Sequence, residues 1–185
     1  MFSLESHWHP LRFRHPAGVP RHAYRWLSDS GSLTRALVSR CNGRFSVEVV
    51  SQGWDAVLPG ERRLLAMRRG EAALVREVRL HCDGEAWVFA RTLIPASSLR
   101  GEARRLAFLG NRPLGAVLFA DPTTRRRLVE FTRLKARHRL HGHATAHLGR
   151  EHAVLWGRRT LFEYAGRPLL VNEIFLPPIP PRRAA

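Results

Sequence analysis

The sequence predicts an α+β protein built on a single antiparallel β-sheet, with helices packed on one face of it. Two observations lead to this fold class. Stretches typical of strands outnumber those typical of helices, and every clear connection between strands is a hairpin turn rather than a crossover helix. The strongest turn is Asp83-Gly84, because a two-residue hairpin loop needs positive φ at both central residues and Asp-Gly adopts it readily.

Composition is that of one globular domain without a membrane span or a secretion signal. The chain has 185 residues, 44% of them hydrophobic, and no apolar run approaches the ~20 residues that cross a bilayer. The first residues scatter His, Arg and Pro and lack the apolar stretch of a signal peptide. Two cysteines, Cys41 and Cys82, are too few for a disulfide framework, and Cys82 fits a small core thiol. These features predict a cytoplasmic protein.

The charge is strongly positive but evenly spread. The formal net charge is +16, and Lys135 is the only lysine among 31 Lys and Arg residues. The arginines occur mostly as doublets along the whole chain, and Arg125-Arg126-Arg127 is the longest run. This pattern indicates compositional bias rather than a binding stripe. We therefore expect no specific nucleic-acid partner, only salt-dependent attraction to polyanions.

The elements that precede the central hairpin are short. Ser32 has the side chain of a helix N-cap, Asn42-Gly43 is a typical helix end, and Leu58-Pro59-Gly60 breaks the chain. We expect, in chain order, a loosely held arm over 1–22, a short helix over 23–27, a helix over 33–41, a strand from 45 that continues irregularly to 57, and a turn or short helix over 61–67.

The central hairpin, residues 74–93, places two arginines on an apolar face. If Asp83-Gly84 is the whole loop, Arg76 lies directly opposite Arg91. Opposed like charges destabilise a sheet, and a buried guanidinium without a partner is costly. The hairpin therefore predicts the floor of a pocket for a small anion, since the planar guanidinium fork suits carboxylates and phosphates. The alternative is a rim position, where both arginines reach water.

Weaker signals follow the hairpin, which Pro95 ends. The pattern over 123–136 fits either a strand or a helix, and we favour a strand. We expect, in chain order, a helix over 100–109, a turn over 110–113, a second helix over 114–119 that acts as a cover, the strand over 123–136, a His-rich loop insertion over 137–152, and a second hairpin over 153–176. The single domain then spans 23–177, with a tail over 178–185.

The His-rich stretch holds five of the ten histidines: His138, His141, His143, His147 and His152. His141 and His143 could reach one metal ion from a strand or loop. No Cys or Asp accompanies them within the stretch, and Glu151 is the nearby carboxylate. We therefore expect a solvated loop and no metal site.

The second hairpin places a carboxylate on an apolar face. With Ala165-Gly166 as its loop, Glu173 lies opposite Arg158 and shares a face with Val171 and Phe175. One interpretation of Glu173 is a cross-strand ion pair with Arg158. The other is an acid, base or hydrogen-bond acceptor whose pKa is tuned by burial.

Several motifs, in their order and rough spacing, resemble the chorismate pyruvate-lyase family over about residues 25–177. In chain order, the motifs are Val75-Arg76-Glu77-Val78, Cys82-Asp83-Gly84-Glu85-Ala86-Trp87, Ala90-Arg91-Thr92-Leu93-Ile94-Pro95, Pro113-Leu114-Gly115, Leu118-Phe119, Leu155-Trp156-Gly157-Arg158-Arg159, Gly166-Arg167-Pro168-Leu169-Leu170 and Glu173-Ile174-Phe175-Leu176-Pro177. Ala90 stands where the family commonly has glycine.

The resemblance implies a lyase that converts chorismate to 4-hydroxybenzoate and pyruvate, an early step of ubiquinone biosynthesis. It implies a ligand buried under helix-turn-helix flaps, no cofactor and a monomer. It also implies substrate contacts from Arg76 to the ring carboxylate, from the Leu114 backbone, from Glu173 to the ring hydroxyl, and from Leu33 at a position often held by Met.

The resemblance also makes Arg91 and Glu173 the catalytic candidates. Arg91 would stabilise the departing enolpyruvyl group, and Glu173 would take the ring proton or only fix the hydroxyl. The alternative function is a non-catalytic sensor of the same fold that binds a small aromatic acid. Retention of both Arg91 and Glu173 favours the enzyme.

Overall fold

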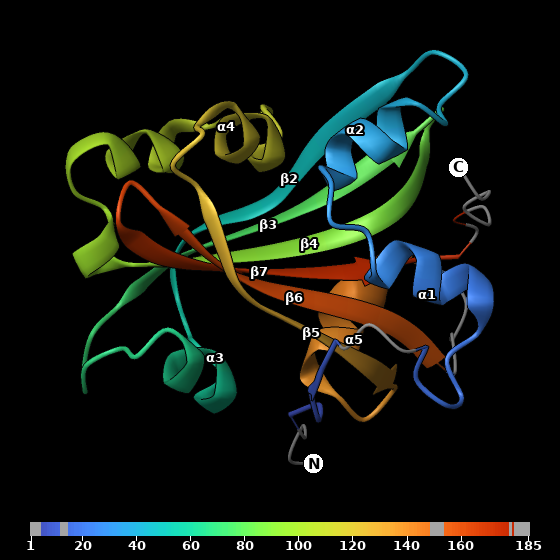
Figure 1. Ribbon diagram of the computed structural model, residues 1–185, viewed down its shortest axis with the longest axis horizontal. Helices are drawn as coiled ribbons and strands as arrows, with labels where there is room; N and C mark the ends of the chain where they lie inside the picture. Colours follow the sequence, from blue (N-terminus) through green and yellow to red (C-terminus); the bar gives the residue numbers. More distant parts are fainter. Residues whose placement is uncertain (1–4, 12–14, 149–153, 178, 180–185) are drawn as a thin grey trace.

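The computed structural model describes residues 5–11, 15–148, 154–177 and 179. Within these residues, seven strands form one antiparallel sheet in the order β1-β5-β6-β7-β4-β3-β2 (Figure 1). The bounds are β1 His9–Pro10, β2 Phe45–Asp55, β3 Ala73–Cys82, β4 Glu85–Pro95, β5 Arg125–Lys135, β6 Val154–Tyr164 and β7 Arg167–Phe175. The predicted α+β class with an antiparallel sheet is confirmed.

Short helices cover both faces of this sheet. On one face lie α1 (Arg21–Leu27), α2 (Leu33–Val38), the 3-10 helix η2 (Gly101–Phe108) and α4 (Leu114–Ala120); η1 (Ala96–Ser98) leads into them. On the other face lie α3 (Pro59–Leu64) and α5 (Arg139–Thr145), as Figure 1 shows for the pair below the sheet. This second layer is an addition to the prediction, which had helices on one face. None of the described helices has the length and apolar character to cross a bilayer.

The signals for both hairpin turns and for the N-cap at Ser32 are confirmed, whereas α2 ends at Val38, before the predicted helix end at Asn42-Gly43. Asp83 and Gly84 have φ values of 51° and 90°, and the second loop, Ala165-Gly166, is also left-handed. The Ser32 Oγ accepts a hydrogen bond from the Arg35 N–H at 3.3 Å and begins α2. The favoured strand assignment for residues 123–136 is confirmed by β5.

The N-terminal arm is held against the sheet over its described part, so the expectation of a loose arm is wrong there. His9–Pro10 pairs with β5, and the Thr132 Oγ1 donates to the His7 carbonyl at 2.6 Å. The Gly60 N–H donates to the Glu5 carboxylate at 2.8 Å. Strand pairing of two residues leaves no period in the sequence, which is why the pattern did not reveal it. Residues 1–4 and 12–14 of the predicted arm lie outside the described residues.

The His-rich stretch contains a helix, and the expectation of a solvated loop is wrong for its described part. Leu140 and Ala144 of α5 pack against Phe89 and Ile174 on the second face of the sheet. His138 and His141 are buried with them. Among the residues that the structure describes, no three His, Cys, Asp or Glu side chains gather as metal ligands do. His152 and Glu151 lie outside the described residues, as does most of the predicted tail.

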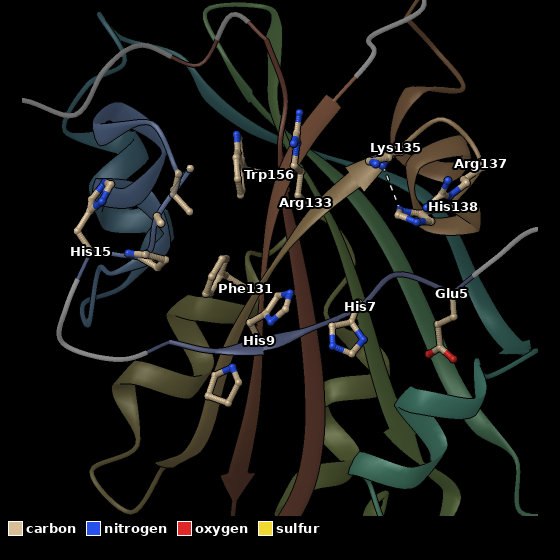
Figure 2. A pocket seen from close by; sticks show the side chains of 15 residues that line it. Glu5, His7, His9, His15, Phe131, Arg133, Lys135, Arg137, His138 and Trp156 are labelled. Atoms are coloured by element: carbon tan, nitrogen blue, oxygen red, sulfur yellow. Dashed lines mark hydrogen bonds between the residues drawn. The ribbon is translucent and has the colours of Figure 1, made fainter.

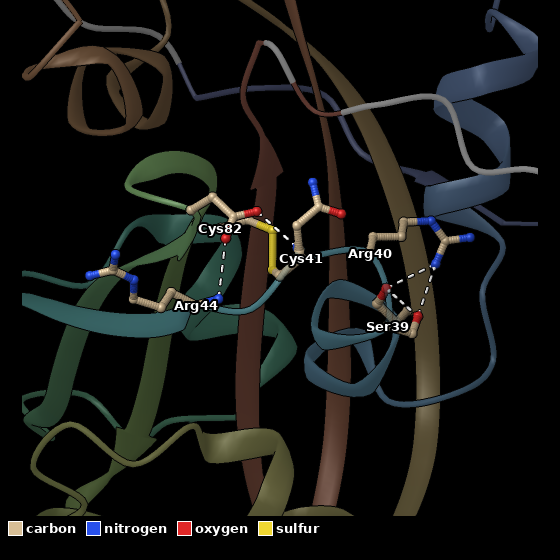
Figure 3. The surroundings of a disulfide bond; sticks show 8 residues. Ser39, Arg40, Cys41, Arg44 and Cys82 are labelled. Atoms are coloured by element: carbon tan, nitrogen blue, oxygen red, sulfur yellow. Dashed lines mark hydrogen bonds between the residues drawn. A yellow bond between two sulfur atoms is a disulfide. The ribbon is translucent and has the colours of Figure 1, made fainter.

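Cys41 and Cys82 form a disulfide, which corrects the expectation of a free core thiol. Their Cα atoms lie 5.3 Å apart, and the bond joins the segment after α2 to the end of β3 (Figure 3). Next to it, the Asp83 carboxylate accepts hydrogen bonds from the N–H groups of Asn42 and Arg44 at 2.9 and 3.1 Å. These contacts fix α2 to the tip of the central hairpin, and α2 forms part of the roof over the cavity described next.

Candidate active site

The register of the central hairpin differs from the predicted one by a bulge. Leu80 pairs with Val88 and His81 pairs with Ala86, so Trp87 is an extra residue without a partner of its own. A shift of one residue turns every later side chain of β4 to the other face. Arg76 therefore lies opposite Thr92, and Arg91 lies opposite Glu77. The predicted Arg76–Arg91 pair is wrong, and the two side chains lie on opposite faces.

Arg91 lies on the face covered by α3 and α5, inside a network of protein carboxylates. Its Nε donates to Glu61 at 3.2 Å and its Nη1 to Glu77 at 2.8 Å. Burial alone would lower the pKa of Arg91, but the charges and hydrogen bonds of Glu61 and Glu77 raise it overall. Hydrogen bonds from His143 and Arg91 hold the pKa of Glu77 below its ordinary value although burial opposes them. The carboxylates of Glu61 and Glu77 thus already neutralise Arg91. Arg91 does not line the cavity on the other face of the sheet.

Arg76 is a buried guanidinium without a carboxylate partner among the described residues. Its side chain is almost fully buried, and its Nη2 donates to the carbonyls of Gly110 and Arg112 at 2.7 and 3.3 Å. The Nε of Arg76 is buried and finds no partner in the described part of the chain. Burial lowers the pKa of Arg76. A cation placed in this way favours the entry of an anionic ligand.

A small, partly enclosed cavity of about 50 Å³ lies beside Arg76, between the sheet and the helices α2 and α4. Strands β3, β4 and β7 supply its floor, and Leu33 of α2 and Leu114 of α4 contribute to its roof. A Cβ at Gly115 would come within 2.9 Å of the Thr34 Oγ1, so glycine at this position lets α4 approach α2 and close the roof. The cavity brings together four of the five predicted site residues: Leu33, Arg76, Leu114 and Glu173.

Glu173 lines this cavity and is also ion-paired. The predicted register of the second hairpin is correct: Glu173 lies opposite Arg158, whose Nε donates to the Glu173 Oε2 at 2.7 Å. Arg158 is buried, and its Nη1 donates to the Asp29 carbonyl at 2.6 Å. The pair thus holds the Glu173 carboxylate in place at the cavity wall. Both interpretations of Glu173 are compatible with this arrangement.

Arg126 also lines the cavity, and sequence reasoning did not find it. Its guanidinium carbon lies 5.1 Å from the ring centroid of Phe119 and 5.5 Å from that of Phe162. Burial lowers the pKa of Arg126, and Arg158 lowers it further, whereas Glu173 raises it. The residue stands inside the run Arg125-Arg126-Arg127, which looked like compositional bias. Strand alternation predicts that one member of such a run faces inward, and that signal could have found it.

A second, open groove of about 860 Å³ lies between the N-terminal segment and β5 (Figure 2). Its cations Arg133, Lys135 and Arg137 are exposed to water. Exposed charges of this kind attract polyanions weakly and in a salt-dependent way. Arg76, a buried cation with only carbonyl partners among the described residues, lines the other cavity instead, which is therefore the candidate active site.

The sequence comparisons point to one family. A sequence model of the family described as "Chorismate lyase" matches residues 13–184. A protein from Nitrosospira multiformis is 41% identical over 174 residues, covering 94% of each chain, and one from Methylococcus capsulatus is 45% identical over 155 residues, covering 83% of this chain and 94% of the relative. A protein from Azoarcus is 44% identical over 170 residues, covering 90% of this chain and 89% of the relative. Each of the three bears the name "Probable chorismate pyruvate-lyase".

Solved structures share the fold at low sequence identity. The effector domain of PhnF from Mycobacterium smegmatis superposes with a TM-score of 0.53 at 19% identity, covering 80% of this chain and 89% of that one. A GntR-family transcriptional regulator from Bacillus cereus gives a TM-score of 0.54 at 8% identity, covering 76% of this chain and 97% of that one. At such identities the likeness establishes the fold alone.

Proposed function

This chain belongs to the chorismate lyase family, and from that premise we propose that it converts chorismate to 4-hydroxybenzoate and pyruvate in the enclosed cavity. The observation that carries the proposal is Arg76, a buried cation that faces this cavity and has only carbonyl partners within the described residues. A ring carboxylate would supply the missing anion through a charge-assisted hydrogen bond.

The remaining cavity residues suit the rest of the ring. The walls between Arg76 and Glu173 are mostly apolar, with Val78, Ala90 and Val171 among them. In the proposed binding mode the ring lies on this apolar surface, the Leu114 backbone and Leu33 contact it from the roof, and Glu173 accepts a hydrogen bond from the ring hydroxyl. Arg158 keeps Glu173 oriented for that contact.

The reaction needs little covalent help from the protein. The bond between the ring and the ether oxygen breaks, the oxygen leaves with the electron pair as enolpyruvate, and the hydroxyl-bearing ring carbon loses its hydrogen as a proton. Aromatisation drives both steps, so we propose that no metal or organic cofactor takes part. The protein orients the dianion, excludes water and stabilises the charge that develops on the leaving group. We propose that Glu173 takes the ring proton.

The product would feed ubiquinone biosynthesis, and release from beneath α2 and α4 would be slow enough to limit turnover. The protein would act as a monomer in the cytoplasm. A sensor that binds a small aromatic acid is the competing function, because regulators share this fold.

The Arg76→Ala variant tests the observation that carries the proposal. We expect it to weaken 4-hydroxybenzoate binding by about 1.5–3 kcal/mol, the usual contribution of a charged hydrogen bond. Titration calorimetry measures the loss. Arg79→Ala is the matched control, because Arg79 lies on the same strand, on the other face, and pairs with Glu48. Equal affinity of the folded Arg76→Ala variant and the control would refute the assignment.

A further inference from the structure

We propose that Arg126 binds the second carboxylate of the substrate, the one carried by the enolpyruvyl group; this inference rests on the proposed function. Chorismate is a dianion, and Arg76 can neutralise only the ring carboxylate. The family resemblance implies Arg91 at the enolpyruvyl group, but the Arg91 side chain lies on the opposite face with Glu61 and Glu77. Among the described residues that line the cavity, Arg76 and Arg126 are the two arginines.

The position of Arg126 matches the connectivity of the substrate. In chorismate the carbon that bears the enolpyruvyl ether is bonded to the carbon that bears the hydroxyl, and the ring carboxylate lies away from both. A residue for the enolpyruvyl carboxylate must therefore lie near the group that contacts the hydroxyl. Arg126 and Glu173 line the same cavity and lie close enough for the Glu173 charge to act on Arg126.

The guanidinium of Arg126 has an N–H donor that no described residue accepts. Its Nη1 donates to the carbonyls of Ser30 and Asp29, and its Nη2 donates to the Gly31 carbonyl at 2.7 Å. The Nε–H is buried and has no partner among the described residues. Nε and Nη2 form one edge of the guanidinium, and such an edge binds a carboxylate through two parallel hydrogen bonds.

The charges around the cavity balance those of a dianion. Glu173 and Arg158 pair with each other at 2.7 Å and cancel. Arg76 and Arg126 then remain as two cations that line one cavity, and the charge of Asp29 raises the pKa of Arg126. Two carboxylates at the two ends of one ligand would complete both sites.

Arg126 is held in place before any ligand arrives. Its guanidinium is flanked by the rings of Phe119 and Phe162 and is tied to the loop that leads into α2. Phe119 belongs to α4, so the Arg126 side chain contacts both α4 and the loop before α2, the two segments that form the roof. A donor fixed in this way loses little conformational entropy when the carboxylate binds.

The test compares a ligand that has the second carboxylate with one that lacks it. For Arg126→Gln we expect kcat/KM for chorismate to fall by about 10- to 100-fold, the range of one charged hydrogen bond, while the affinity for 4-hydroxybenzoate stays within about twofold of the parent. Arg127→Gln is the matched control, since Arg127 is the next residue, is 57% exposed and pairs with Glu163. It should leave both quantities unchanged.

Other outcomes are decisive as well. If Arg126→Gln weakens 4-hydroxybenzoate and chorismate equally, Arg126 only supports the roof and the inference is wrong. If the glutamine variant does not fold, Arg126→Lys decides by the same comparison, because it keeps one charge without the fork and should selectively impair chorismate. An unchanged kcat/KM in a folded Arg126→Gln variant also overturns the inference. Failure of the proposed function is seen separately, as a parent protein that leaves chorismate intact.

Discussion

Replacing Glu173 by Gln should slow the conversion of bound chorismate by about 100-fold or more, the usual scale of general acid–base help. Glutamine fills the same space and still offers an oxygen to the Arg158 Nε, but it cannot take a proton from the ring. The buried Arg158 loses its charged partner in this variant, so we expect some loss of stability, and the control below gives its size. Because product release from the enclosed cavity can hide the chemical step, the rate is measured in a single turnover, with enzyme in excess over chorismate.

Glu130 provides a matched control for the loss of an ion pair. It accepts from the Arg159 Nε at 2.5 Å, its side chain is 13% exposed against 14% for Glu173, and it does not line the cavity. Glu130→Gln should therefore match Glu173→Gln in melting temperature and keep the parental single-turnover rate. A normal rate in Glu173→Gln would leave Glu173 with a structural role only.

Replacing Arg91 by Met should lower the free energy of unfolding by about 3–5 kcal/mol, the cost of leaving buried charges without their partner. Glu61 and Glu77 both depend on Arg91, and the side chains of all three are less than 10% exposed. Methionine keeps most of the volume, so the loss reports the missing charge rather than a cavity. Urea unfolding of parent and variant measures the difference.

An exposed pair supplies the comparison. Arg127→Met removes a surface ion pair with Glu163 and should cost less than about 1 kcal/mol. If Arg91→Met were as stable as the parent and yet failed to act on chorismate, the role of Arg91 at the leaving group, which the family resemblance implies, would be restored. Because Arg91 lies on the face of the sheet opposite the cavity, we expect Arg91→Met to lower stability strongly and to affect the reaction itself much less.

The two hairpins show which cross-strand pairs the sequence pattern can predict and which it cannot. Turn signals at Asp83-Gly84 and Ala165-Gly166 located both hairpins correctly. In the second hairpin the strands pair without a bulge, so the Arg158–Glu173 pair followed from counting alone. In the first hairpin one extra residue, Trp87, reversed the face of Arg91. A bulge depends on packing against the rest of the fold, and counting residues between strands cannot reveal it.

Other features depend on contacts between distant segments. The edge strand His9–Pro10 is too short to have a period, and α5 owes its stability to the packing of Leu140 and Ala144 on the sheet. The disulfide joins residues 41 positions apart, and two cysteines give no hint that they meet. Arg126 could not be singled out because arginine is abundant along the whole chain. Strand alternation and the family motifs agree on Arg76 and Glu173, whereas the family resemblance alone led us to expect Leu33 and Leu114, which lie on helices, at the site.

Incubation of the purified protein with chorismate, followed by measurement of 4-hydroxybenzoate and pyruvate, tests the proposed activity most directly. We expect both products to appear in equal amounts, without added metal or cofactor, and the reaction to slow as 4-hydroxybenzoate accumulates. Intact chorismate in the presence of protein that binds 4-hydroxybenzoate tightly would contradict the proposed activity and would favour a sensor of small aromatic acids.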